Sequence, residues 1–197
     1  MKRRIFLGCD PDIHNMSIVA VDDMLDVVGI WMVKEKGNKG RKAVLQMATK
    51  GVMKLVRQEQ GTLMTDVCAI AVEGQNVTYT ANTGAKPQDI VDLAGAAGAF
   101  ISVLAALNPH ADAFYPAPSE WKGTVKKSVH QVRTMKKLGF NYEMKGGNKP
   151  YPVPHKEQWE DKVLGPDKIN PGDWVDIADS AGLACWARDQ FYKGIKK

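Results

Sequence analysis

The first 33 residues contain three short apolar runs separated by turn residues, and this pattern constrains the fold more than any other feature. The runs cover about 5–10, 17–21 and 27–33. Runs of Val, Ile and Leu that are this short and end at turn residues are typical of β-strands. Because only a few residues connect them, we expect the three strands to form an antiparallel meander.

Further along the chain, helical patterns alternate with strand patterns. We expect helices at about 41–58, 88–107, 119–139 and 173–192, and strands at 68–72 and 113–115. The third of these helices is either continuous or broken at Gly123. Three antiparallel strands followed by alternating helices and strands predict an α/β fold with one mixed five-stranded sheet flanked by helices.

Residues 140–172 interrupt this order and hold five of the ten prolines. We expect a long irregular insertion with one helical turn near 158–163, and such loops in compact domains are usually functional or mobile. No domain-sized linker occurs, so residues 1–197 are expected to form a single domain.

The overall composition fits an ordinary globular domain, with 44% hydrophobic and 25% charged residues. It excludes collagen-like, low-complexity and largely disordered chains. No run of 18 apolar residues occurs, so no transmembrane helix and no membrane partner are predicted. The apolar run after the basic N-terminus stops at Asp10, too early for a signal peptide, and we expect a cytoplasmic protein of a bacterium or an infected host cell. The three cysteines are far apart and are expected to be reduced core residues: Cys9, Cys68 and Cys185.

The distribution of charge suggests a polyanionic partner. The net charge is +5, but residues 34–57 hold eight basic residues and one acid, and residues 119–149 hold eight basic residues and two acids. Residues 64–118, between them, hold one lysine and five acids. Basic blocks around an acidic centre indicate a polyanion held around a metal-binding site. Charge alone is equally consistent with solvated helix faces.

Four carboxylates occur where the expected fold would bring them together. Asp10 ends the first strand and Glu73 ends the fourth, so both emerge at one sheet edge if these strands are parallel neighbours. Asp176 and Asp179 are three residues apart near the start of the last helix and share one face of it. Each acid alone is also explained by solvation or by the helix dipole. Together they predict a site for Mg²⁺ or Mn²⁺, which prefer oxygen ligands.

Six segments in collinear order resemble the motifs of one family. They are LGCDP at 7–11, AVE at 71–73, LAGAAG at 93–98, APSEWKGTV at 117–125, the basic helix at 127–138, and DIADSA at 176–181. In this order the chain resembles the RuvC-type Holliday junction resolvases of the ribonuclease H-like superfamily, and viral or bacteriophage members more than the cellular bacterial enzyme. It departs from the family at Asp12, where a small residue is expected, and in the shorter spacing between Lys122 and Lys127.

The resemblance implies a magnesium-dependent endodeoxyribonuclease that resolves four-way junctions by paired nicks, leaving 5′-phosphate and 3′-hydroxyl ends. By it, Asp10, Glu73, Asp176 and Asp179 hold two Mg²⁺ (or Mn²⁺) ions for phosphodiester hydrolysis. Lys122 and Lys127 carry over as lysines near the scissile phosphate.

Several further residues are expected to contact DNA. If 119–139 is one helix, a cationic stripe forms from Lys122, Lys126, His130, Arg133 and Lys137, with a buried face of Trp121, Val125, Val129, Val132 and Met135. The family's aromatic after the glutamate is displaced here, and Tyr79 is the nearest candidate to stack on an unpaired base at a junction. The stripe also fits a solvated helix face, and Tyr79 also fits a loop aromatic packed on the domain.

The near two-fold symmetry of a four-way junction predicts a homodimer with one active site per chain. A candidate interface is the stripe of mostly small residues at Gly95, Ala96, Ala99, Ser102, Val103 and Ala106, which fits packing on the chain's own sheet equally well. Three other functions compete with a junction resolvase. They are a less selective flap or branched-DNA nuclease, a catalytically inert nucleic-acid-binding module, and an actin-like phosphotransferase, for which the chain is too short.

Overall fold

The computed structural model of the chain describes residues 3–12, 14–35, 42, 46–51, 53–54, 57, 66–74, 87–165 and 167–195. Its main sheet contains β1 (Ile5–Asp10), β2 (Asn15–Asp22), β3 (Val27–Lys34), β4 (Val67–Val72) and β5 (Asp112–Phe114). Its helices are α3 (Pro87–Leu107), α4 (Pro118–Trp121), α5 (Lys127–Lys137) and α6 (Trp174–Ile195). A separate hairpin contains β6 (Tyr142–Lys145) and β7 (Tyr151–Pro154), and single helical turns occur at Met47–Gly51, Lys156–Gln158, Glu160–Lys162 and Pro171–Asp173.

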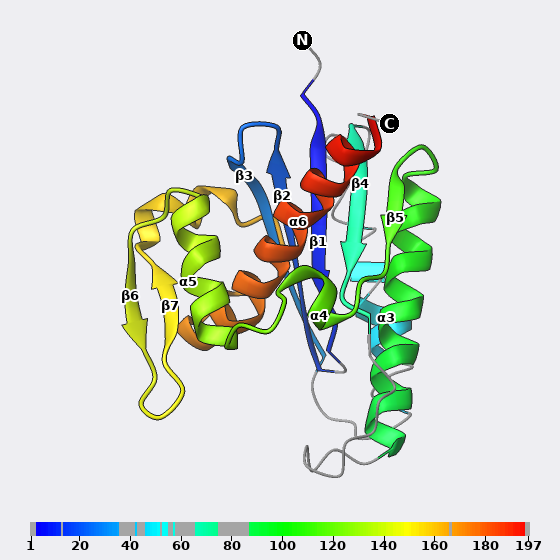
Figure 1. Ribbon diagram of the computed structural model, residues 1–197. Coiled ribbons are helices and arrows are strands. Elements are labelled where there is room, and N and C mark those ends of the chain that lie inside the picture. Colours follow the sequence, from blue (N-terminus) through cyan, green and yellow to red (C-terminus); the bar gives the residue numbers. More distant parts are fainter. Residues whose placement is uncertain are drawn as a thin grey trace.

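The five strands form one mixed sheet in the order β3-β2-β1-β4-β5 (Figure 1). β1 pairs antiparallel with β2, and β2 with β3, which confirms the predicted meander. β1 and β4 are parallel neighbours, as are β4 and β5. The predicted α/β class and mixed five-stranded sheet are therefore correct, and β1 lies at the centre with its C-terminal end beside that of β4.

Side chains alternate between the two faces of the sheet, and each face has its own helical cover. On one face Phe6, Val19 and Ala71 belong to a core that includes Ile177, Ala181 and other residues of α6. On the other face Leu7, Ile18 and Ile70 pack with Ala97, Phe100 and Leu104 of α3. This alternation is the two-residue period expected of strands buried between two helical layers.

Gly8 of β1 allows α6 to approach the sheet closely. A Cβ atom at this position would lie 2.0 Å from the carbonyl oxygen of Ser180 and 2.2 Å from the backbone nitrogen of Ala184. Any side chain here would therefore push α6 away from β1.

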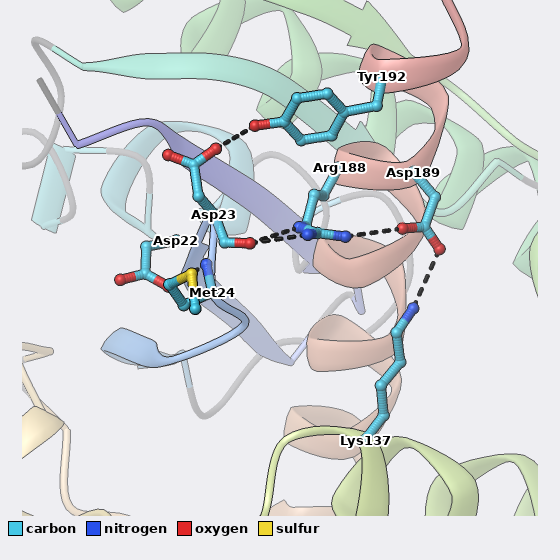
Figure 2. Close-up of polar contacts among 7 residues, drawn as sticks. All are labelled: Asp22, Asp23, Met24, Lys137, Arg188, Asp189 and Tyr192. Carbon is cyan, nitrogen blue, oxygen red and sulfur yellow. Dashed lines mark hydrogen bonds and ion pairs between the residues drawn. The ribbon is translucent and has the colours of Figure 1, made fainter. Parts of the chain in front are cut away.

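The end of α6 is fastened to the turn between β2 and β3 (Figure 2). Arg188 donates from Nη2 and Nε to the carbonyl oxygen of Asp23, at 2.7 and 2.9 Å, and the Tyr192 hydroxyl donates to the Asp23 carboxylate. Asp189 of α6 pairs with Lys137 at the end of α5, with 3.0 Å between Oδ2 and Nζ. These contacts link the meander, α6 and α5.

The start of α6 is fastened to the end of β3. The Lys34 ammonium lies 2.5 Å from Oδ2 of Asp173 and donates to the carbonyl oxygen of Lys168 at 2.9 Å. Its backbone N–H donates to Oδ2 of Asp167 at 2.8 Å. Since Asp173 directly precedes α6, these bonds set where the helix begins.

Of the two alternatives for 119–139, the structure has the helix broken at Gly123, whose φ of +65° favours glycine, so Lys122 and Lys126 lie outside α5. Two other expectations about local structure need correction. Val129, expected on the buried face, is 42% exposed, and the buried residues of α5 are Gln131, Thr134 and Met135. The 140–172 insertion is more regular than expected, because it contains the β6–β7 hairpin. Most of the predicted 41–58 helix lies outside the described residues.

By length and composition, the segment Gln88–Leu107 of α3 could cross a membrane, with a mean hydropathy of 2.1. Its inner side packs in the core beneath the sheet through Ala97, Phe100 and Leu104. Its outer side carries exposed apolar residues, including Val91 at 61% and Leu107 at 40%.

Candidate active site

Asp10 and Glu73 leave the sheet at the same edge. Asp10 is the last residue of β1, and Glu73 follows the last residue of β4. Cys9 and Val72 are paired in the parallel register, and the Glu73 N–H donates to the carbonyl oxygen of Cys9 at 3.0 Å. The predicted convergence of these two strand ends is therefore present.

Asp176 and Asp179 reach this edge from the first turns of α6. The position of α6 is set by Ser180, whose hydroxyl accepts from the Asp10 N–H at 2.9 Å and donates to the carbonyl oxygen of Ser17 at 2.9 Å. Ser180 is fully buried, and its neighbour Asp179 is only 1% exposed. One hydroxyl thus joins β1, β2 and α6 beside the acidic side chains.

The four carboxylates form an electrostatic cluster. Burial raises the pKa of Asp10 well above its usual range, and the negative charges of Asp179 and Glu73 raise it further. Burial likewise raises the pKa of Glu73, although Lys122 opposes the shift. Burial raises the pKa of Asp176 to about 6, with Lys127 opposing and Asp12 adding to the shift. Such shifts mark carboxylates that are deprived of water and held near like charges.

Two lysines partly compensate this acidic cluster. The Lys122 ammonium lies 3.5 Å from Oε2 of Glu73, and that of Lys127 lies 2.8 Å from Oδ2 of Asp179. Burial lowers the pKa of Lys127, but Asp179 and Asp10 outweigh burial and raise it overall. Both lysines predicted to act near the scissile phosphate therefore lie among the carboxylates.

Gln131 is a site residue that sequence reasoning missed. It is 1% exposed, and its amide nitrogen donates to Oδ1 of Asp179 at 3.1 Å and to the carbonyl oxygen of Val175 at 2.8 Å. It follows Lys127 by four residues on α5, so one helix face engages both carboxylate oxygens of Asp179. That spacing was the only available signal, and it becomes informative only once α5 is known to pack on α6.

The donor set fits a hard divalent cation. Four carboxylates offer only oxygen ligands, and their mutual repulsion is the environment that bound Mg²⁺ or Mn²⁺ relieves. In the described part of the chain, no three acidic, histidine or cysteine side chains are already arranged around a common ion position. The ammonium groups of Lys122 and Lys127 contact Glu73 and Asp179 instead.

The residues predicted to contact DNA differ in how exposed they are and in whether they are paired with another side chain. Lys126, at the start of α5, and Arg133 are exposed. Lys137 is also exposed and pairs with Asp189 at the surface, whereas His130 is half-buried with its ring against Trp121. The continuous stripe expected from the sequence is thus replaced by separate exposed cations. Tyr79 lies outside the described residues.

No known family model matches the sequence, and no curated protein sequence matches it either. The fold does have solved relatives. A structure of Thermus thermophilus RuvC in complex with a Holliday junction substrate superposes with a TM-score of 0.54 at 13% identity, covering 97% of this chain and 96% of that one. A second structure of Thermus thermophilus RuvC gives a TM-score of 0.51 at 14% identity, covering 98% and 96%. The chain therefore has a RuvC-like, ribonuclease H-like fold over nearly its whole length.

Proposed function

We propose that this protein is a metal-dependent, structure-selective DNA endonuclease that resolves four-way junctions. The observation that carries the proposal is the gathering of Asp10, Glu73, Asp176 and Asp179 at one edge of a RuvC-like sheet. Clustered buried carboxylates cost stability in the absence of a cation, so their presence favours a catalytic centre over a purely structural surface. That argument weighs against the inert binding module.

Each group at the edge has a role in phosphodiester hydrolysis. Asp10, Glu73, Asp176 and Asp179 would hold the magnesium or manganese ions. Bound there, the ions would supply Lewis-acid activation of water and of the phosphate. Lys122 and Lys127 would place positive charge beside the phosphate oxygens as negative charge develops on them. Gln131 would keep Asp179 oriented through its 3.1 Å hydrogen bond.

Branched DNA would be held by the exposed cations around this edge. Lys126 directly precedes α5, close in sequence to Lys127 of the acidic cluster, and Arg133 is exposed on the same helix. Phosphate contacts from such residues give affinity without base recognition, as a structure-selective enzyme requires.

Two copies of the chain would make the paired nicks. The outer side of α3 offers a surface for this assembly, because Gly95, Ser102 and Ala106 are exposed together with Val91 and Leu107. The predicted stripe needs one correction, since Ala96 is fully buried and packs within the chain. An exposed apolar helix side with small residues allows two helices to approach closely.

The deciding experiment compares DNA structures and metals. Purified protein is incubated with a four-way junction, a flap and a linear duplex of matched sequence, each with Mg²⁺, Mn²⁺ or EDTA. Paired symmetric nicks in the junction, dependent on metal and absent from the duplex, are expected. Equal cleavage of flap and junction would replace the proposal with a general branched-DNA nuclease. Binding without cleavage under every metal condition would favour the inert module.

A further inference from the structure

The β6–β7 hairpin is a two-stranded antiparallel ribbon outside the main sheet, and the active-site chemistry does not use it. Its register pairs Tyr142 with Pro154 and Lys145 with Tyr151, which leaves the connecting loop beyond these pairs. Figure 1 shows this loop directed toward the same end of the molecule as the C-terminal ends of β1 and β4 and the start of α6. The ribbon therefore projects on the side of the acidic edge.

The base of the hairpin is firmly anchored. Pro152, Val153 and Pro154 are buried. The backbone N–H of His155 donates to the carbonyl oxygen of Asn141 at 3.0 Å, which closes the base of the ribbon. Below it, Trp159 donates from Nε1 to the carbonyl oxygen of Pro154 at 3.2 Å and packs edge-on against Trp174, the first residue of α6. The hairpin is thus built as a rigid arm rather than a loose loop.

The outer part of the hairpin is exposed and cationic. All residues from 143 to 150 are exposed, and the turn depends on Gly146, whose φ of +87° favours glycine. Residues 144–156 contain three lysines, one histidine and no acid. The Lys145 ammonium lies 3.4 Å from Oε2 of Glu143, but both are exposed, and such pairs are worth about 0–1 kcal/mol. Lys145 and Lys149 are therefore available to a negatively charged partner.

The two strands of the hairpin differ in their surroundings. Figure 1 shows β7 between β6 and α5, and Pro152 and Pro154 of β7 are buried, so β6 is the outer strand. Glu143, Met144 and Lys145 of β6 are exposed. The part of the hairpin available to a partner is therefore β6 and the turn that follows it.

We propose that the β6–β7 hairpin is a DNA-binding arm that engages a duplex arm of the substrate, with Lys145 and Lys149 contacting its phosphates. A two-stranded ribbon fits the major groove of duplex DNA, and here Lys145 ends β6 while Lys149 lies in the turn that follows it. The proposal rests on the proposed function for its partner, and it adds a contact surface built from residues outside the acidic edge.

The test is the salt dependence of junction binding, measured by fluorescence anisotropy in EDTA so that no cleavage occurs. Loss of two phosphate contacts should make the slope of log affinity against log salt shallower by about 1.8. Both affinities should fall when the salt concentration rises from 50 to 200 mM. The factor by which the wild-type affinity falls should be roughly ten times the factor for Lys145→Ala/Lys149→Ala. The charge-preserving variant Lys145→Arg/Lys149→Arg should retain the wild-type slope.

Two controls distinguish a loss of hairpin contacts to DNA from a general loss of surface charge and from a loss of stability. Lys193→Ala removes an exposed lysine near the end of α6, at the opposite end of the molecule, and should change the slope less than Lys149→Ala alone. Thermal unfolding of the hairpin variants should match the wild type, because both lysines are exposed. Under Mg²⁺, the double variant should show a raised KM with an unchanged kcat.

The possible results are distinct. In one of them, the wild-type protein binds and cuts junctions while the hairpin variants keep the wild-type salt slope and KM. That result would refute the proposal that the hairpin contacts DNA and would leave the nuclease proposal standing. If the wild-type protein binds no DNA at all, both proposals fail. A shallower slope in Lys145→Ala/Lys149→Ala, restored by arginine and absent in Lys193→Ala, supports the arm.

Discussion

The ammonium group of Lys127 lies 2.8 Å from Oδ2 of Asp179, a carboxylate that is almost completely buried. Gln131 engages the other oxygen of the same carboxylate at 3.1 Å. The packing of α5 on α6 therefore determines how Asp179 is oriented. A divalent cation bound by Asp179 would compete with Lys127, so metal binding and release of this lysine toward phosphate are coupled in the proposed enzyme.

Replacing Asp10 should separate cleavage from binding. Asp10→Asn removes an oxygen ligand and one negative charge, so junction cleavage should be abolished while junction affinity stays equal or rises. Gel-based cleavage assays and anisotropy measure the two effects. Asp112→Asn, at the exposed start of β5, is the matched control and should cut normally. Cleavage by Asp10→Asn at a near wild-type rate would refute the assignment of the metal ligands.

Stability in EDTA should depend on pH through Asp176. Its pKa of about 6 in the folded state lies above the ordinary value of 3.8, so the folded state binds the proton more tightly. This contribution is fully present below about pH 4 and is lost as the pH rises through about 6. Asp176→Asn should therefore be more stable than the wild type at pH 7 by about 1 kcal/mol, after allowing for partial solvent screening.

Thermal unfolding at pH 7 and pH 4 tests this expectation. A gain of 1 kcal/mol corresponds to a Tm increase of roughly 2–4 °C for a domain of this size. The gain should vanish at pH 4, where Asp176 is protonated in the folded protein. His130, whose pKa burial lowers, has the opposite pH dependence but is common to both proteins and cancels in the comparison. An equal gain at both pH values would contradict the electrostatic origin.

Removing the Gln131 amide should slow catalysis without weakening DNA binding. Gln131→Met keeps the size of the side chain but leaves Asp179 and the Val175 carbonyl without this donor. Loss of a hydrogen bond that orients a metal ligand typically costs 10–100-fold in activity or metal affinity. Single-turnover cleavage and Mn²⁺ titration measure these effects. Val129→Ala on the exposed side of α5 should leave both unchanged, and wild-type rates in Gln131→Met would exclude a positioning role.

The two lysines preceding α5 should separate binding from chemistry. Lys126→Ala should weaken binding to all DNA sequences and reduce the salt slope by about one, because Lys126 is exposed. Lys122→Ala should instead reduce cleavage more than binding, because its ammonium lies at Glu73. Anisotropy across a salt series and single-turnover kinetics on the same substrate distinguish the two. Identical profiles for both variants would show that they share one role.

Enlarging Gly8 should destabilise the whole domain. The Cβ atom of Gly8→Ala would overlap backbone atoms of α6, which cannot rotate away as a side chain can. We expect a loss of several kcal/mol and a correspondingly lower urea midpoint. Gly98→Ala is the control, since a Cβ atom there meets nothing within 4 Å of this chain and should stabilise α3 by roughly 0.5–1 kcal/mol. A folded Gly8→Ala protein of wild-type stability would contradict this close packing.

The sheet and the acidic edge were predictable because local patterns determine them. Short apolar runs identified the five strands, and an acid at the end of β1 and another after β4 became neighbours once those strands paired in parallel. The spacing of Asp176 and Asp179 needed only the geometry of a helix. Only the meeting of these groups at one edge required an assumption about packing, namely that β1 pairs with β4 and that α6 covers the sheet.

The features that the sequence analysis left open or missed depend on tertiary packing or on a single backbone angle. A break at Gly123 was one of two alternatives for 119–139, and the cationic stripe depended on the other; the positive φ of Gly123 decides between them. The β6–β7 hairpin was missed because three alternating prolines resemble irregular chain, although their spacing suits one strand edge. Gln131 carries no charge, and its role exists only because α5 packs against α6.

The hydrogen bond between the Asp10 N–H and Ser180 spans 170 positions of the chain. The acidic cluster therefore contains residues from β1 and from α6. Because the chain is synthesised from its N-terminus, α6 is the last of the elements in the cluster to be made. While the chain is being translated, β1 to β3 are complete long before Asp176 and Asp179 exist. A nascent chain, or one cut short before α6, lacks two of the four carboxylates, so the proposed nuclease would become active only once α6 has been made and packed on the sheet.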